Sequence, residues 1–199
     1  PALLLLDEPL AALDAGTRAA VRGDLRRHLA AFPGPALLVT HDPLEAMTLA
    51  DRLVVLERGR VVQSGSPADV ARRPRTGYVG QLVGLNVYRG AAADGALAVD
   101  GGGTVRFAGT ATGRGAAAVR PSAVTLHVAP PSVSSLRNVW SGLLETLEPF
   151  GDRVRATVRA ELPLLVDVTV AAVAELRLEP GATVWASVEA TDVDVYPEE

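Results

Sequence analysis

The chain has 199 residues, of which 48 % are hydrophobic, and a formal net charge of −4. This length suits one or two domains, the acidic balance is unlike a nucleic-acid-binding surface, and the absence of cysteine excludes disulfides and thiolate metal sites. No apolar run approaches the ~20 residues that span a bilayer, and no charged-then-apolar signal segment opens the chain.

The first predicted element is a strand that ends in two acids. Leucines occupy positions 3–6, Asp7 and Glu8 follow, and Pro9 stops the strand. A continuous apolar run of this kind predicts a strand buried on both faces of a parallel sheet. Open α/β sheets bind ligands at the carboxyl ends of such strands, which is where the two acids lie. Because the chain enters this strand directly at Pro1, we expect an upstream part to be missing.

Residues 3–14 resemble the Walker B strand and D-loop of ABC-transporter ATPases, with four apolar residues, Asp-Glu-Pro and then Leu13-Asp14. The resemblance implies that Asp7 holds Mg²⁺, directly or through water, and that Glu8 polarises the water that attacks the γ-phosphate. It also implies that Asp14 communicates with the opposite ATPase subunit. Mg²⁺ prefers carboxylate and water oxygens, and phosphoryl transfer depends on an oriented nucleophile. Asp-Glu-Pro alone is common in loops, so the identification depends on the whole pattern.

Apolar residues at helical spacing predict a helix over 14–31 with Asp14 as its N-cap. The run 36–40 predicts the next parallel strand, and His41 and Asp42 follow it directly. His41 is therefore expected at the same sheet edge as the two acids. The segment resembles the switch-histidine loop of the same family, which implies that His41 contacts the γ-phosphate. The alternative is a helix-capping His-Asp pair without a ligand.

The next elements also follow the order found at the end of an ABC ATPase domain. We predict a short helix over 43–50, a strand over 51–56, a returning strand over 61–64, and a helix that starts at Pro67 with Ser66 as its cap. The resemblance extends to residue 84. Residues 1–84 are thus expected to be the C-terminal part of an α/β ATPase domain, with parallel strands and helices.

From residue 85 onward, short strands and glycine-rich turns predict an all-β domain over 85–199. Residues 117–126 resemble a segment of the TOBE-like accessory domain of importer ATPases, which implies an OB-like barrel. We expect two halves, at about 85–129 and 132–196, built of antiparallel strands. The second half is predicted to contain a short helix over 171–176 and a turn at Pro180-Gly181.

A second informative stretch surrounds Arg137. The sequence Ser134-Ser135-Leu136-Arg137-Asn138 is similar to the signature of molybdate-binding modules. The resemblance implies four candidate oxyanion ligands: Ser134, Ser135, Arg137 and Asn138. An arginine can bind an oxyanion bidentately. However, Glu189 stands where that family usually carries lysine, and an acid would repel an anion. The alternatives are that Arg137 and Asn138 fix a strand corner through backbone hydrogen bonds, or that Arg137 pairs with Glu189.

Together these resemblances identify the chain as the C-terminal portion of an importer ATPase subunit of the molybdate type. They imply ATP hydrolysis coupled to uptake of a small anion such as molybdate, with ATP and Mg²⁺ as cofactors, at the cytoplasmic face of the cell membrane. The implied partners are transmembrane permease subunits, a second ATPase subunit and, indirectly, a substrate-binding protein.

The family's P-loop, glutamine loop and signature motif do not occur, and the chain contains no lysine for a P-loop. In the family these motifs lie upstream of the Walker B strand, so we expect this chain alone not to hydrolyse ATP. The alternatives are an importer ATPase for sulfate, iron, sugar or polyamine, a stand-alone oxyanion-binding module, and an inactive fragment.

Overall fold

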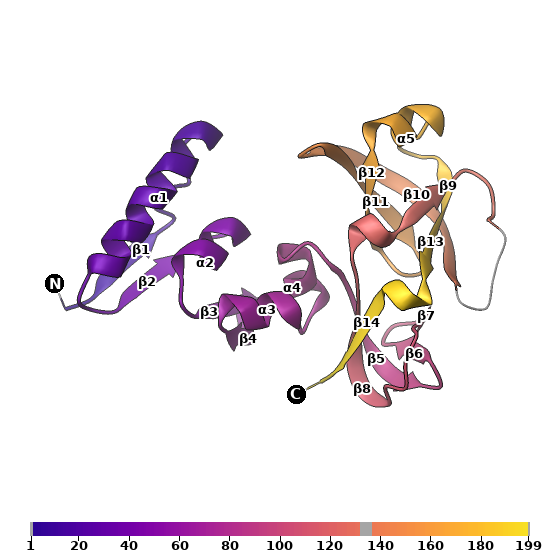
Figure 1. The fold of residues 1–199 in the computed structure, drawn as a ribbon, viewed down its shortest axis with the longest axis horizontal. Coiled ribbons are helices and arrows are strands. Elements are labelled where there is room, and N and C mark those ends of the chain that lie inside the picture. The colour runs from indigo at the N-terminus through magenta and orange to yellow at the C-terminus, as the bar shows by residue number, and fades with distance from the viewer. Residues whose placement is uncertain (1, 132–136, 199) are drawn as a thin grey trace. The chain divides into compact units, whose positions relative to one another are not determined.

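The computed structural model describes residues 2–131 and 137–198. The chain divides into two compact units, Pro1–Arg73 and Pro74–Glu199, and β-strands predominate. Within the described residues, no helix combines the length and apolar character needed to cross a membrane. The elements of both units are labelled in Figure 1.

The first unit alternates strands and helices. Its elements are β1 (Leu4–Asp7), α1 (Ala15–Ala31), β2 (Ala36–Val39), α2 (Pro43–Leu49), β3 (Leu53–Glu57), β4 (Arg60–Gly65) and α3 (Pro67–Arg72). β1 and β2 pair in parallel, with Asp7 opposite Val39, whereas β3 and β4 form an antiparallel hairpin. The predicted elements are present with boundaries that differ by a few residues.

The helix starts of this unit follow the predicted capping chemistry. The Asp14 carboxylate accepts hydrogen bonds from the backbone N–H groups of Gly16 and Thr17 at 3.1 and 3.0 Å. The Ser66 hydroxyl accepts one from the N–H of Asp69 at 3.2 Å. These bonds satisfy N–H groups that have no partner inside the first helical turn. Both predicted N-caps are therefore confirmed.

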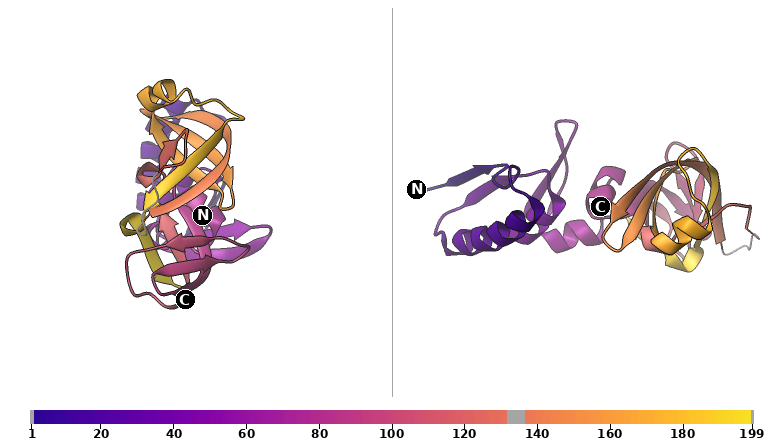
Figure 2. Two further views of the ribbon diagram at one scale, coloured as in Figure 1. Left: turned by 90° about the vertical axis from the view of Figure 1, so that its right-hand side faces the viewer. Right: turned by 90° about the horizontal axis from the view of Figure 1, so that it is seen from above.

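The β1–β2 pair is covered on one face. α1 lies along this face in the right-hand view of Figure 2. The opposite face leaves Leu5, Leu37 and Val39 more than half exposed. Burial on both faces was predicted for the strand within a complete domain, with its other covering elements in the upstream part that is expected to be missing, and the exposed face of this chain agrees with that expectation. The described chain supplies one parallel neighbour, β2, and one covering helix layer.

The second unit contains two five-stranded sheets and short helices. Its elements are α4 (Gly77–Leu82), β5 (Asn86–Ala93), β6 (Ala96–Val99), β7 (Thr104–Arg106), β8 (Gly113–Val119), η1 (Pro121–Ala123), β9 (Thr125–His127), β10 (Arg137–Phe150), β11 (Arg153–Ala160), β12 (Leu164–Thr169), α5 (Val170–Glu175), β13 (Thr183–Glu189), η2 (Ala190–Asp192) and β14 (Val193–Pro197). Leu97 and Val105 of one sheet share a buried cluster with Leu144, Val158 and Val184 of the other.

The second unit begins at Pro74, earlier than the boundary after residue 84 that the sequence indicated. α4 packs on β5, and Val79 in this helix is fully buried. The hydroxyl of Tyr196, near the end of the chain, donates a hydrogen bond to the carbonyl of Pro74 at 2.8 Å. Residues 74–84 thus pack with the β-rich unit, because the apolar side of α4 is covered there.

The two sheets repeat one arrangement. One sheet has the order β14-β8-β5-β6-β7, and the other, read from its opposite edge, has the order β9-β13-β10-β11-β12. β5 to β8 therefore correspond to β10 to β13. Each half sends its last strand to the other sheet, since β9 pairs with β13 and β14 pairs with β8. The predicted halves at 85–129 and 132–196 are consequently two repeats that exchange a strand, and neither half makes a complete sheet.

Two asparagines mark the repeat at equivalent positions. Asn86, the first residue of β5, exchanges two hydrogen bonds with the backbone of Leu165 in the edge strand β12. Asn138, the second residue of β10, does the same with the backbone of Arg106 in the edge strand β7. Each amide side chain thus satisfies the backbone of the opposite sheet's edge strand and ties the two sheets together.

We expect the two units to differ in local stability. The second unit encloses a continuous apolar cluster, whereas the first leaves apolar side chains of β1 and β2 in contact with solvent. Amide hydrogen exchange measured by mass spectrometry should therefore show slow exchange in β8, β10 and β13 and faster exchange in β1 and β2. Equal and strong protection of the strands in both units would contradict this expectation.

Candidate functional site

The first candidate site lies at the carboxyl edge of the β1–β2 pair. Glu8 directly follows β1, and its backbone N–H donates to the carbonyl of Val39 in β2 at 2.9 Å. The backbone of Glu8 has a φ of 45°, in the left-handed region that non-glycine residues seldom adopt. Such backbone conformations cluster at functional sites, because surrounding contacts must hold them in place.

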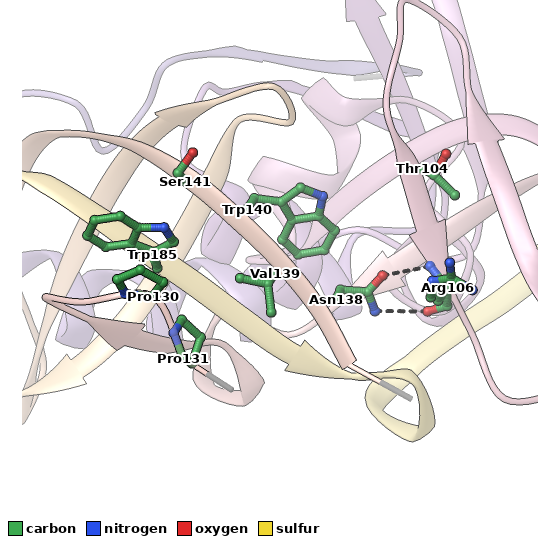
Figure 3. Close-up of a pocket in the computed structure, with 9 residues that line it drawn as sticks. All are labelled: Thr104, Arg106, Pro130, Pro131, Asn138, Val139, Trp140, Ser141 and Trp185. Atoms are coloured by element: carbon green, nitrogen blue, oxygen red, sulfur yellow. Dashed lines mark hydrogen bonds between the residues drawn. The ribbon is translucent and has the colours of Figure 1, made fainter. Parts of the chain in front are cut away.

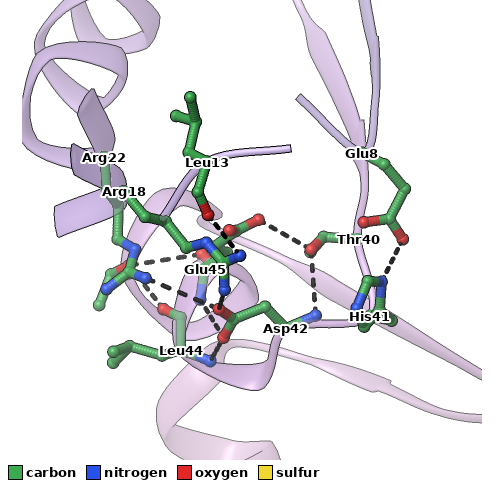
Figure 4. Close-up of polar contacts among 10 residues, drawn as sticks. Glu8, Leu13, Arg18, Arg22, Thr40, His41, Asp42, Leu44 and Glu45 are labelled. Atoms are coloured by element: carbon green, nitrogen blue, oxygen red, sulfur yellow. Dashed lines mark hydrogen bonds and ion pairs between the residues drawn. The ribbon is translucent and has the colours of Figure 1, made fainter. Parts of the chain in front are cut away.

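Glu8 and His41 are in direct contact at this edge. The Nδ1 atom of His41 lies 2.8 Å from the Glu8 Oε1 atom, as Figure 4 shows. The His41 side chain is 81 % exposed and that of Glu8 is 35 % exposed, so an incoming ligand can reach both. The sequence predicted that the two residues share a sheet edge, and the parallel register of β1 and β2 brings their side chains together.

The hydrogen bond and the negative charge of Glu8 raise the pKa of His41 above its usual value of 6.5, and the charges of Asp42 and Glu45 add to this effect. Because the folded-state pKa exceeds the unfolded one, the contact stabilises the fold fully below about pH 6.5. This stabilisation is lost as the pH rises through the folded-state pKa. The protonated form of His41 is the one that forms an ion pair with the Glu8 carboxylate.

This pair can be tested by titration. In an NMR pH titration of the chain, His41 should titrate above 6.5, and Glu8→Gln should bring its pKa down towards that value by removing the carboxylate. Glu57→Gln is a matched control, because it makes the same change in β3, and it should leave the titration of His41 unchanged. A His41 pKa that is the same in Glu8→Gln and in the unmodified chain would contradict the contact.

The other two acids of the first stretch occupy different settings. Asp7 is exposed at the end of β1. Asp14 caps α1, and its hydrogen bonds to Thr17 lower its pKa below the usual value. Within residues 2–131 and 137–198, no group of three or more His, Asp or Glu side chains is arranged to hold a metal ion. Asp7 and Glu8 are nevertheless the oxygen donors that Mg²⁺ prefers, and Mg²⁺ commonly takes its remaining ligands from water and substrate phosphates.

A polar network beside His41 was not predicted from the sequence. The Thr40 hydroxyl donates to a carboxylate oxygen of Glu45 at 2.8 Å and accepts from the N–H of Asp42 at 3.1 Å. Arg18 and Arg22 of α1 face the Asp42 carboxylate (Figure 4). Their spacing of four residues on the helix is a sequence signal of a shared face.

The candidate oxyanion ligands lie in the second unit. Ser134 and Ser135 fall outside the described residues. Arg137 begins β10, where the strand register places it opposite Glu189. Asn138 is 4 % exposed, its Oδ1 accepts from Arg106, and its Nδ2 donates to the carbonyls of Arg106 and Val188. Both N–H groups of this amide are therefore engaged by backbone carbonyls, and neither is left for an anion. These bonds match the alternative in which Asn138 fixes a strand corner through backbone hydrogen bonds.

A pocket of about 500 Å³ adjoins the start of β10. Figure 3 shows Trp185, Pro130 and Pro131 on one side of it, and Thr104 and Arg106 on the other. Asn138, Val139, Trp140 and Ser141 complete its lining. The side chain of Asn138 lies at the Arg106 end of the pocket, where its amide is bonded to the backbone of that residue.

In comparison with known protein families, residues 134–195 match the TOBE domain. Among curated proteins, the chain is 36 % identical to the molybdenum import ATP-binding protein ModC of Mycobacterium tuberculosis strain H37Rv, over 99 % of this chain and 56 % of ModC. It is 31 % identical to the molybdate/tungstate import ATP-binding protein WtpC of Pyrococcus horikoshii, over 99 % of this chain and 57 % of WtpC.

A third relative is the sn-glycerol-3-phosphate import ATP-binding protein UgpC of Rhodopseudomonas palustris strain BisB5, which is 40 % identical over 68 % of this chain and 36 % of UgpC. The chain thus spans little more than half the length of ModC and WtpC. Among solved structures, the molybdate-bound cytoplasmic molybdate-binding protein ModG aligns with a TM-score of 0.51 and 25 % identity, covering 57 % of this chain and 96 % of ModG.

Proposed function

Because the chain is a homologue of the ATP-binding subunits of ABC importers and contains a TOBE domain, we propose that it acts within such a subunit. In the longer protein it would take part in ATP hydrolysis coupled to the uptake of a small anion such as molybdate. The observation that carries this proposal is the contact between Glu8 and His41 at the edge of β1 and β2, in a chain whose relatives include molybdate importers. Sulfate, iron, sugar or polyamine importers would use the same site.

The residues at this edge would divide the chemistry between them. Asp7 is the proposed ligand of Mg²⁺, which would neutralise charge on the nucleotide phosphates when bound. Glu8 would accept a hydrogen bond from the attacking water and so polarise it. His41, which is largely exposed and carries a raised pKa, would present an N–H group to the γ-phosphate. Asp14, at the start of α1, would face the second ATPase subunit.

A longer importer subunit would also account for the exposed apolar face of β1 and β2. The relatives are nearly twice as long as the matched region, so a longer protein has further chain that can cover Leu5, Leu37 and Val39. The proposed partners are transmembrane permease subunits at the cytoplasmic side of the membrane, together with a second copy of the ATPase subunit. The 199-residue chain alone is not expected to hydrolyse ATP.

A second candidate function concerns the β-rich unit alone. Its likeness to ModG, a molybdate-binding protein, favours an oxyanion-binding module. Against this function, Glu189 lies opposite Arg137 in the strand register, and the Asn138 amide is engaged by backbone groups. We therefore propose that the unmodified unit serves as a structural or regulatory module and binds oxyanions weakly.

Isothermal titration of the chain with molybdate, tungstate and sulfate tests this second candidate. Little binding is expected for the unmodified chain, because an acid near the anion position repels the ligand. Glu189→Lys should increase affinity, since it reverses that charge. Glu179→Lys makes the same change at an exposed turn residue and should have no effect. Tight molybdate binding by the unmodified chain that is lost in Arg137→Ala would favour the stand-alone module instead.

A further inference from the structure

Arg18, on the first turn of α1, contacts two of the proposed functional segments at once. Its Nη2 atom donates to the carbonyl oxygen of Leu13 at 2.9 Å. Its Nη1 atom lies 4.0 Å from the Oδ2 atom of Asp42. Leu13 directly precedes Asp14, and Asp42 directly follows His41. One guanidinium group therefore bridges the Leu13–Asp14 segment and the His41–Asp42 loop.

The two oxygens of Asp42 have separate partners. Its Oδ1 atom accepts from the N–H groups of Leu44 and Glu45 at 2.8 and 3.3 Å and so caps α2. Its Oδ2 atom faces the arginines, with the Nη2 atom of Arg22 at 3.6 Å. Asp42→Asn removes the charge that faces the arginines but keeps a side-chain oxygen that can cap α2. This substitution can therefore weaken the arginine contact without unfolding α2.

The residue before His41 is held as well. The Thr40 hydroxyl donates a hydrogen bond to the Glu45 carboxylate and accepts one from the Asp42 N–H. Glu45 is buried, with only 2 % of its surface exposed. His41 therefore lies between two residues whose side chains are fixed by α1 and α2. Its ring position depends on these neighbours together with its own bond to Glu8.

The arginine contacts lie partly within the packing between α1 and α2. The side chains of Arg18, Arg22 and Asp42 are 32 %, 17 % and 23 % exposed. The Nε atoms of both arginines are buried, and no partner for them lies among the described residues. Partly buried charge pairs are screened less than exposed ones, so loss of one member is felt by the other.

We propose that Arg18 is a positioning residue that couples the Leu13–Asp14 segment to the His41 loop through Asp42. This inference rests on the proposed function. If the Leu13–Asp14 segment moved, Arg18 would move with it because of its bond to the Leu13 carbonyl. The contact of Arg18 with Asp42 would then shift Asp42 and the adjacent His41. The water-polarising Glu8 and its partner His41 would then be aligned only when the Leu13–Asp14 segment is in place.

The coupling itself can be tested in the 199-residue chain without nucleotide. The Leu13 N–H, which is bonded to the Leu10 carbonyl, does not touch Asp42. Asp42→Asn, which keeps the cap of α2, should nevertheless speed hydrogen exchange at Leu13 about tenfold, measured by NMR. The same substitution made in an Arg18→Ala background should add no further change. Arg26→Ala, an exposed arginine of the same helix, is the matched control and should leave the Leu13 exchange rate unchanged.

An unchanged Leu13 exchange rate in Asp42→Asn would overturn the coupling. So would an acceleration that persists in full when Arg18 is already alanine. Asp42→Asn keeps Arg18 and the helix cap, so the proposal stays falsifiable even where Arg18→Ala impairs folding.

A second arm uses the longer importer subunit. Arg18→Ala and Asp42→Asn should each lower kcat for ATP hydrolysis about tenfold, with KM for ATP nearly unchanged, because they misplace a group that acts on the water and leave nucleotide binding intact. Glu8→Gln serves as the reference. Normal turnover in Glu8→Gln would refute the proposed function, whatever the Arg18 result. Loss of turnover in Glu8→Gln with unchanged kcat in the Arg18 and Asp42 variants would refute this inference alone.

Discussion

In the proposed importer subunit, Glu8→Gln should reduce ATP turnover by roughly 10²–10⁴-fold, the usual contribution of a positioned general base, which is the role proposed for Glu8. The amide keeps the size and shape of the side chain, and nucleotide affinity should therefore remain. The glutamine amide can still form a hydrogen bond with the His41 ring, but it lacks the negative charge that helps to raise the pKa of His41. The lost rate thus reflects the missing carboxylate at the edge of β1.

Phosphate release measured together with nucleotide binding checks this expectation. Glu57→Gln makes the same chemical change in β3, away from His41, and should retain full turnover. His41→Ala should lower turnover as well, through loss of its proposed contact with the γ-phosphate. Unchanged hydrolysis in Glu8→Gln would show that the Glu8–His41 contact has a structural role only.

The second large effect concerns the β-rich unit. Leu144 in β10 is fully buried in the cluster that both sheets share. Leu144→Ala should lower the free energy of unfolding by roughly 2–5 kcal/mol, because a cavity is left in a packed core. Leu143→Ala is the matched control, since this neighbour points to the opposite face of the strand and is only half-buried, and should cost about 1 kcal/mol or less.

Tryptophan fluorescence during urea unfolding measures this difference selectively. Both tryptophans of the chain, Trp140 and Trp185, lie in the second unit, so the signal reports on that unit. The midpoint for Leu144→Ala should fall well below that for Leu143→Ala. Equal midpoints for the two variants would mean that the two sheets do not enclose a shared core.

Local chemistry made much of the first unit predictable. The two apolar runs predicted the strands β1 and β2. The capping residues Asp14 and Ser66 indicated where α1 and α3 begin. The parallel pairing of β1 and β2 placed His41 at the same edge as Glu8. The side-chain contact and the left-handed backbone of Glu8 could not be predicted, because they depend on how the two turns meet in space.

The strand exchange of the second unit could not be predicted from the local sequence pattern, because β9 and β14 each pair with a strand from the other half of the unit. One signal was present in the sequence. Asn-Val-aromatic-x-Gly occurs at residues 86–90 and again at 138–142, and these two stretches begin the corresponding strands β5 and β10. The glycines, Gly90 and Gly142, sit where a Cβ would collide with the carbonyl oxygen of the neighbouring strand.

The placement of α4 was missed for a similar reason. A helix of six residues contains little information about which unit it packs against. Its burial against β5, and the bond from Tyr196 to Pro74, form only once the distant end of the chain has folded. The boundary at Pro74 is therefore a property of tertiary packing and not of the sequence around residue 84.

Transport is the most direct test of the proposed function. Vesicles that contain the longer subunit with its permease partners should take up one of molybdate, tungstate and sn-glycerol 3-phosphate in an ATP-dependent manner, and Glu8→Gln should stop that uptake. If ATP-dependent uptake continues at the normal rate in Glu8→Gln, the central claim that this edge of β1 and β2 carries out ATP hydrolysis is contradicted.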